Sequence, residues 1–291
     1  MVAAESGTGI PLGVASGTYT IRPPLIKPSK LTCVEKGGVG RQLSDGWALN
    51  FAIGCNFGCK FCYVDQIHKR SGRSRAGDIV NRDWGYYFAI PSNLEEAIRQ
   101  TDWKRWKDEE VMISSMHDPY LPQLFKWTRV ILEKALPEGV RFCVQTRSPL
   151  VERDFGLLSK YKEQLRVQVS IATMGSELSR LTEPRVVPPQ RRVEVIRKAR
   201  ESGLDVGVII APVFPPVRLR QDVPGDLKAI AAALEEIRPE HIYGESLHAR
   251  GSNLKYIEKA LGERVLLKGF DERAEKCFHC ALPSGTWWPE R

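Results

Sequence analysis

The chain has 291 residues, of which 42% are hydrophobic and 27% are charged, enough to bury a sizeable core in one large domain or two small ones. This hydrophobic fraction excludes a wholly disordered chain, and no apolar run reaches the ~20 residues that a membrane helix needs. With 43 Lys and Arg against 35 Asp and Glu, the net charge of +8 is compatible with nucleic-acid binding and with an ordinary basic surface.

The N-terminal segment 1–45 is rich in Gly, Pro, Ser and Thr, which predicts an extended arm that wraps the domain behind it. Its beginning lacks the positive charge and the apolar centre of a signal peptide. We therefore expect a cytoplasmic protein that does not enter the membrane.

The next part of the chain mixes short elements with basic stretches. An apolar run at 47–53 predicts a buried strand, 64–69 predicts the beginning of a helix, and 84–90 predicts another strand. The stretch 68–75 is basic, contains Gly and is expected to be an exposed loop. Ser92 and Glu95 have the spacing of a capping box, which predicts a helix that runs toward Thr101.

From residue 111 onward, strands and helices alternate. Strands are predicted at 111–116, 140–145, 165–172, 204–210 and 241–247, and helices at 122–136, 150–161, 189–202, 225–237 and 252–261. Together with the strand at 47–53 this makes six β/α units, too few for a closed eight-stranded barrel. The predicted fold is α/β: an open, partial (β/α)6 TIM-type barrel over 46–262, followed by a C-terminal extension over 263–291. Its active site should lie at the C-terminal ends of the strands.

Three of the seven cysteines follow the first predicted strand in the pattern C-x3-C-x2-C, as Cys55, Cys59 and Cys62. An odd number of cysteines and the absence of a secretion signal argue against a disulfide framework. Three thiolates on a short loop can bind three irons of a cuboidal iron–sulfur cluster and leave the fourth iron open. A structural zinc site is the alternative, although zinc usually takes four ligands.

A second pair, Cys277 and Cys280, forms C-x2-C near the C-terminus and needs further ligands to hold a metal. Cys33 is the candidate third ligand, and His279 or a substrate atom the fourth. An auxiliary iron–sulfur cluster, a zinc site and free thiols all stay open. Cys143 lies in an apolar strand and is expected in the core.

The loop with Cys55, Cys59 and Cys62, and with Phe61 before the last of them, resembles the radical S-adenosylmethionine (SAM) superfamily. Over roughly residues 45–250 the chain is similar to the spore photoproduct lyase-like branch. Its motifs are matched by 114–122 (SSMHDPYLP), 145–150 (QTRSPL), 167–173 (VQVSIAT), 182–184 (TEP) with 190–192 (QRR), and 208–213 (VIIAPV).

This resemblance implies a [4Fe–4S] cluster on the three loop cysteines, with SAM on the fourth iron. Reductive cleavage of SAM would then supply a 5′-deoxyadenosyl radical that abstracts hydrogen from a substrate. The resemblance also implies that Ser115 contacts the methionyl group of SAM, and that Arg147 or Ser170 contacts its carboxylate or ribose. Tyr63 would act as a radical relay or pack beside the cluster.

The chain also departs from that branch. Spore photoproduct lyase has a hydrogen-donating cysteine near the second strand, where this chain has Ile113 and Ser114. It has a tyrosine where this chain has Phe61. Repair of spore-type thymine dimers by the same route is therefore not expected.

Other candidates lie near the predicted strand ends. His117 and Asp118 can bind substrate or relay a proton, although Asp118 can also cap a turn before Pro119. Glu245 and His248, after the last strand, are weaker candidates. The stretches 68–75 and 103–107 have the cations and aromatics of a nucleic-acid surface, but a solvated loop and helix end explain them equally. Trp287 and Trp288 are expected to pack against the barrel.

The sequence thus predicts a radical SAM enzyme that repairs or modifies nucleic acid, either DNA or tRNA. Its partners would be that nucleic acid and an electron donor such as ferredoxin or flavodoxin. The alternatives are radical modification of a protein, peptide or small metabolite, and a non-catalytic zinc-binding protein.

Overall fold

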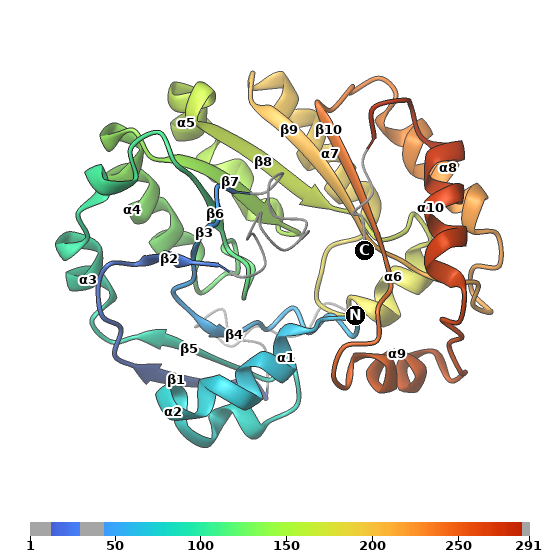
Figure 1. Cartoon of the computed structure of the whole chain (residues 1–291), viewed down its shortest axis with the longest axis horizontal. Coiled ribbons are helices and arrows are strands. Elements are labelled where there is room, and N and C mark those ends of the chain that lie inside the picture. The colour runs from blue at the N-terminus through green and yellow to red at the C-terminus, as the bar shows by residue number, and fades with distance from the viewer. Residues whose placement is uncertain (1–12, 30–43, 287–291) are drawn as a thin grey trace.

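The computed structural model describes residues 13–29 and 44–286, so Cys33, Trp287 and Trp288 lie outside the described residues. The main sheet has six parallel strands whose spatial order follows the chain (Figure 1). They are β3 (Trp47–Leu49), β6 (Glu110–Ile113), β7 (Arg141–Thr146), β8 (Leu165–Ser170), β9 (Asp205–Val213) and β10 (His241–Ser246). A seventh strand, β2 (Ile26–Pro28), pairs antiparallel with β3 at one edge. Since β2 and β10 are the two ends of this sheet and do not pair, the barrel is open, as predicted.

Helices connect the strands and cover the outside of the sheet (Figure 1). They are α4 (Phe125–Ala135) after β6, α5 (Phe155–Leu158) after β7, α6 (Ser176–Thr182) and α7 (Pro189–Glu201) after β8, α8 (Val223–Leu234) after β9, and α9 (Asn253–Leu261) and α10 (Phe270–Ala281) after β10. The strands are buried on both faces, which explains the continuous apolar runs in their sequences. In α4, the buried residues Thr128, Ile131, Leu132 and Ala135 recur at helical spacing and form the face that packs on the sheet.

A small second sheet lies beside the cysteine loop. It consists of β1 (Ala15–Tyr19), β4 (Ile53–Gly54) and β5 (Tyr87–Pro91), with β5 in the middle. Helices α1 (Val64–Ile67), α2 (Arg73–Ala76) and α3 (Leu94–Gln100) belong to the same part of the chain. The described part of the N-terminal arm therefore supplies one strand to each sheet. Within the described residues, no helix combines the length and apolar character needed to cross a bilayer.

Several local predictions were wrong. The stretch 68–75 is helical, because a π-helical turn over His68–Gly72 joins α1 to α2, and His68 is buried. The Ser92 hydroxyl donates to the carbonyl of Tyr19 instead of capping α3, so the capping box does not form. Helix α10 was not predicted, and the predicted helix at 150–161 is broken by 3-10 turns on both sides of α5.

Candidate active site

One cavity of about 410 Å³ lies at the C-terminal ends of the parallel strands, beside the cysteine loop. Its walls contain most of the candidate residues from the sequence: Cys55, Cys59, Cys62, Tyr63, Ser115, His117, Asp118, Arg147, Ser170, Glu245 and His248. These residues are far apart in the chain and meet because parallel strands all end at one edge of the sheet.

The cysteine loop turns sharply and is held close to β5. Gly54 has φ +88°, and a Cβ atom there would lie 2.4 Å from the Tyr87 carbonyl oxygen, so the position needs glycine. Backbone bonds from Gly58 to Cys55 (3.3 Å) and from Cys62 to Cys59 (3.2 Å) fold the loop into successive turns. As a result all three thiols border the same cavity.

Burial makes these thiols hard to ionise while no metal is bound. It raises the pKa of Cys55 to about 11 and that of Cys62 to about 12, and it raises the pKa of Cys59 well above its usual value. The Arg147 cation opposes this rise at all three thiols. Backbone N–H groups of Phe57 and Asp118 do so at Cys55, and that of Val64 does so at Cys62. The same groups would stabilise thiolates once iron displaced the protons.

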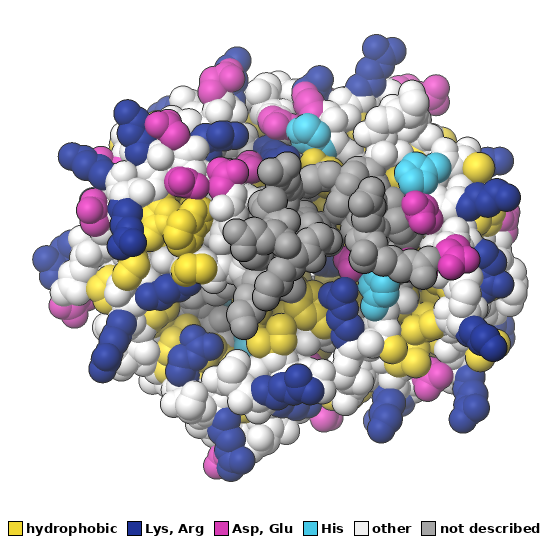
Figure 2. Space-filling view, viewed as in Figure 1, with side chains coloured by type: hydrophobic (Ala, Val, Ile, Leu, Met, Phe, Trp, Pro, Cys, Tyr) yellow, Lys and Arg dark blue, Asp and Glu magenta, His cyan; other side chains and the backbone are white. Residues whose placement is uncertain are grey.

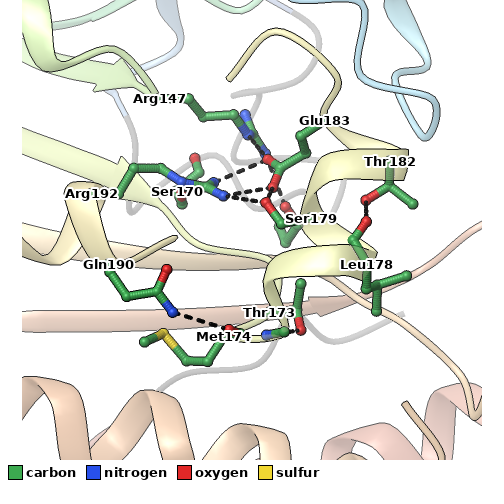
Figure 3. Close-up of polar contacts among 12 residues, drawn as sticks. Arg147, Ser170, Thr173, Met174, Leu178, Ser179, Thr182, Glu183, Gln190 and Arg192 are labelled. Atoms are coloured by element: carbon green, nitrogen blue, oxygen red, sulfur yellow. Dashed lines mark hydrogen bonds and ion pairs between the residues drawn. The ribbon is translucent and has the colours of Figure 1, made fainter. Parts of the chain in front are cut away.

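Arg147 belongs to a buried charge network around Glu183, which Figure 3 shows. Its Nε donates to Glu183 Oε1 (2.9 Å) and its Nη2 to the Ala211 carbonyl (3.0 Å). Arg192 donates to both oxygens of Glu183, at 3.0 and 2.7 Å, and the Ser179 hydroxyl donates to Oε2 at 3.1 Å. Burial opposes ionisation of Glu183, but the two cations are so close that its pKa is nevertheless lowered.

This network limits what Arg147 can offer to a ligand. Its Nε and one Nη2 hydrogen are used inside the protein, so the side-on edge of the guanidinium, formed by Nε and Nη2, is occupied by Glu183 and the Ala211 carbonyl. Only the outer Nη hydrogens of Arg147 are left for a bound molecule. Its guanidinium also lies 5.4 Å from the ring centre of Phe61, next to the last cysteine.

Asn50, which sequence reasoning missed, holds the loop after β6. Its Oδ1 accepts hydrogen bonds from the Ser115 N–H (3.0 Å) and the Ser114 hydroxyl (2.8 Å), and its Nδ2 donates to the Ser115 hydroxyl (3.0 Å). The Tyr63 hydroxyl donates to the Ser115 carbonyl at 3.3 Å. Ser115 is therefore fixed from β3 and from the cysteine loop, at the cavity wall.

His117 and Asp118 line the cavity, but their hydrogen bonds are made within the protein. His117 is buried, its Nδ1 lies 3.1 Å from the Ser114 hydroxyl, and burial lowers its pKa to about 3. Asp118 accepts from the Thr146 hydroxyl (2.7 Å), the Arg147 N–H (2.7 Å) and the Tyr120 N–H (2.9 Å). These hydrogen bonds position the loop after β6.

The far wall of the cavity carries ionic side chains at the end of β10. Glu245 Oε1 lies 3.3 Å from Arg250 Nη2 and 3.6 Å from His248 Nε2. The Arg250 guanidinium lies 5.6 Å from the ring centre of Tyr63. Ser170, at the end of β8, is positioned through its carbonyl, which accepts from Arg192 Nη1 at 2.7 Å.

The C-terminal cysteine pair does not join this cavity. Cys277 and Cys280 lie on α10, which packs beside α8 on the outside of the sheet (Figure 1). Cys277 is partly buried and Cys280 is exposed. Among the described residues, no three His, Cys, Asp or Glu side chains are grouped so as to hold a single metal ion. Cys143 is fully buried, as predicted.

The stretch 103–107, one of the two that suggested a nucleic-acid surface, keeps its aromatic side chains inside. Trp103 and Trp106 are buried, and Trp103 Nε1 donates to the Ile98 carbonyl at 3.1 Å. Only the intervening cations, among them Lys104 and Arg105, are exposed. Stacking of bases on these tryptophans is therefore excluded in this conformation.

Known proteins resemble the chain in sequence. The profile of the radical SAM superfamily matches residues 49–230. An uncharacterized protein of Acidianus two-tailed virus is 56% identical over 283 residues, which are 96% of this chain and 94% of that protein. An uncharacterized protein of Methanocaldococcus jannaschii is 27% identical over 171 residues, which are 58% of this chain but only 61% of that protein.

Solved structures resemble the chain in fold. Spore photoproduct lyase complexed with dinucleoside spore photoproduct has a TM-score of 0.64 and 15% identity, covering 94% of this chain and 80% of that one. A mutant of the same enzyme with bound AdoMet and the dinucleoside has a TM-score of 0.63 and 14% identity, with the same coverage. At this level of identity the likeness shows a common fold.

Proposed function

This chain belongs to the radical SAM superfamily, and on that basis we propose that it uses a [4Fe–4S] cluster and SAM to take a hydrogen atom from a nucleic acid. The observation that carries the proposal is the meeting of the three loop cysteines with Ser115, Arg147 and Ser170 around one cavity. When bound, the cluster and SAM supply a 5′-deoxyadenosyl radical, which abstracts the hydrogen atom.

The donor set fits an iron–sulfur cluster. Cys55, Cys59 and Cys62 offer three thiols to one cavity, and thiolates are the ligands that such clusters prefer. The backbone N–H groups of Phe57 and Asp118 beside Cys55, and that of Val64 beside Cys62, would compensate part of the negative charge of the thiolates. The charge of Arg147 acts on all three thiols, and we assign it the role of balancing the charge of the thiolates.

The polar groups opposite the cysteine loop fit SAM. Ser115 follows β6 and Ser170 ends β8, on either side of β7, and both lie in the cavity wall, where hydroxyls can bond an amino acid or a ribose. Glu183 accepts hydrogen bonds from both Arg147 and Arg192, and this pairing fixes the Arg147 side chain beside the cysteine loop. Phe57, Phe61 and Trp84 add apolar surface to the walls, which would keep water away from a radical.

Several features support nucleic acid as the substrate. The chain carries a net charge of +8, and the Arg250 guanidinium and the Tyr63 ring both line the cavity. The fold is shared with an enzyme whose solved structure holds a dinucleoside. On the face that Figure 2 shows, the described Lys and Arg side chains are spread among acidic ones and not gathered in one patch. This distribution favours recognition of a short stretch or a single exposed nucleotide over a long duplex.

The chemistry is tested by anaerobic reconstitution, followed by iron and sulfide counts and by addition of dithionite and SAM. We expect about four irons per chain and formation of 5′-deoxyadenosine. Cys59→Ala should abolish both, whereas Cys280→Ala, at an exposed cysteine, should keep both. Zinc in place of iron, or no cleavage of SAM by the loaded protein, would contradict the proposal.

The substrate is tested separately with deuterated DNA and tRNA oligonucleotides. Transfer of deuterium into 5′-deoxyadenosine would identify the nucleic acid that is attacked. Its binding should weaken steeply between about 50 and 200 mM salt, because cations on the protein replace counterions of the phosphates. Deuterium transfer from peptides or metabolites alone would replace this substrate assignment but leave the radical chemistry standing.

A further inference from the structure

The outer side of the cysteine loop, facing away from the cavity, is fastened to two other segments. Lys60 donates its backbone N–H to the Thr182 carbonyl at the end of α6 (2.8 Å). Arg185, three residues later, donates from Nη1 to the carbonyls of Asn56 (2.8 Å) and Gly85. One arginine thus clamps the cysteine loop against the turn before β5.

At two glycines the cysteine loop and this turn meet backbone to backbone, beside the Arg185 guanidinium. Gly58 and Gly85 have φ of +66° and +94°, and a Cβ atom on Gly85 would lie 2.7 Å from Gly58 Cα. Cys59 follows Gly58 directly, so this cluster ligand is one residue away from the contact with the neighbouring segment. An electron that arrives here has a short path to the site of the cluster.

The surface at this place is basic and carries an exposed aromatic ring. Lys60 is half-buried, while Arg82 and Lys259 are exposed, and Asp83 is the acidic residue among them. Burial is the main cause that lowers the pKa of Lys60, and the charges of Arg185 and Lys259 act in the same direction.

Tyr86 is 41% exposed and is one of two large hydrophobic side chains among the described residues that face water to this extent. The Arg185 guanidinium lies 4.4 Å from its ring centre. Tyr and Arg are residues that protein interfaces concentrate at their energetic centres. We call the set Lys60, Tyr86, Arg185 and Lys259 the loop-back surface.

We propose that the loop-back surface is the docking site of a small acidic electron-transfer protein, a partner that rests on the proposed function. Docking there brings the redox group of the donor against the backbone around Cys59. The donor is oxidised by one electron and the cluster is reduced by one, and no bond forms or breaks in this step. A few cations and one aromatic residue suit the small, transient interfaces of redox partners, in which complementary charge raises the rate of association.

The test compares two reductants of the reconstituted full-length protein, with 5′-deoxyadenosine as the readout. One is an acidic flavodoxin kept reduced by its reductase, and the other is dithionite. At low salt, Lys60→Gln combined with Lys259→Gln should slow the flavodoxin-driven reaction about tenfold, in line with the loss of electrostatic steering. The dithionite-driven rate and the iron content should stay within about twofold of the parent protein, and salt should suppress the flavodoxin-driven rate of the parent.

Lys160→Gln with Lys162→Gln is the matched control, because both lysines are exposed and precede β8 at the opposite end of the barrel. Lys259→Glu alone, on α9 and outside the cysteine loop, is a second variant that should also slow only the flavodoxin-driven reaction. An unchanged flavodoxin-driven rate, an equal loss with dithionite, or a loss of nucleic-acid binding alone would overturn the docking site. Failure of the parent protein with dithionite would instead overturn the proposed function.

Discussion

At the scale of single residues, the site depends on charges that are buried in pairs. Glu183 and Arg192 are both fully buried, and Arg147 completes the group from the cavity side. A buried carboxylate between two guanidinium groups is tolerated because each charge has partners, and removing one partner leaves the others uncompensated. The carboxylate therefore fixes the position of the cation that faces the thiols.

Replacing Glu183 tests this arrangement. Glu183→Gln leaves two buried cations without a counter-charge, and we expect a loss of about 3–5 kcal/mol in the free energy of unfolding. Urea unfolding of the metal-free protein measures it. Glu177→Gln is the control, since this glutamate is exposed in the first turn of α6, and it should cost at most about 1 kcal/mol. A loss below about 1 kcal/mol for Glu183→Gln would mean that the network does not stabilise the fold.

His68 makes stability depend on pH. Its Nδ1 accepts the Gly54 N–H at 3.0 Å, and burial, with a smaller contribution from Arg75, lowers its pKa to about 4. The unfolded chain takes up the proton near pH 6.5, so the stability contributed by the neutral ring is complete above that pH and is lost as the pH falls toward 4. At pH 5 the loss is about 2 kcal/mol for His68 and about as much for His117, whose pKa is also lowered, to about 3.

Between pH 7.5 and pH 5, His68→Asn should therefore lose about 2 kcal/mol less stability than the parent protein does. Urea unfolding at the two pH values measures the difference, and other titrating groups cancel because they are common to both proteins. Identical pH dependence in His68→Asn and the parent would refute this account.

At the scale of elements, backbone geometry decides where the cysteine loop can lie. Gly54 and Gly58 both have positive φ, and Gly54 touches the backbone of β5 directly. Any side chain at Gly54 would meet both an unfavourable φ and the Tyr87 carbonyl. The loop is therefore held by packing against the second sheet as well as by its own turns.

Gly54→Ala should destabilise the protein by about 3 kcal/mol or more and reduce the iron bound after reconstitution. Gly203→Ala provides the matched comparison, because Gly203 has φ +74° but no neighbour within 4 Å of its Cβ position. It should cost only about 1 kcal/mol and keep the full iron content. Equal effects of the two substitutions would show that the contact with Tyr87 is unimportant.

At the scale of the whole molecule, the open barrel separates two groups of cysteines. The loop cysteines lie at the cavity, whereas Cys277 and Cys280 lie on the outer helix α10. The Ser246 hydroxyl donates to Asp271 and joins the first turn of α10 to the end of β10. The cysteines follow in the second half of the helix, farther from the strand ends.

Replacing both tail cysteines by serine tests whether they hold a second metal group. Since the described residues add no further metal ligands around them, we expect Cys277→Ser with Cys280→Ser to keep about four irons per chain and full formation of 5′-deoxyadenosine. Iron and zinc analysis of the reconstituted variant measures this. A fall from about eight irons to four, or the loss of one zinc, would establish the second site.

Much of the fold was predictable because its signals are local. The apolar strand at 47–53 and the alternation of strands with helices after residue 111 predicted the six β/α units. Ser115, Arg147 and Ser170 were named from the family resemblance, and they line one cavity. Where local patterns misled, a distant segment was the cause. Ser92 bonds β1 instead of capping its own helix, and the tryptophans at 103 and 106 are buried by the fold despite their basic neighbours.

By itself, the sequence determined the order of the strands and the place of the cysteine loop behind the first of them, since periodicity and spacing are properties of short segments. Only the tertiary structure decided which charges are paired and which are presented to partners. Glu183 lies 36 residues from Arg147 along the chain, and Asn50 lies 65 residues from Ser115. Such pairs form because strands and loops converge at one end of a barrel, and no local pattern encodes that convergence.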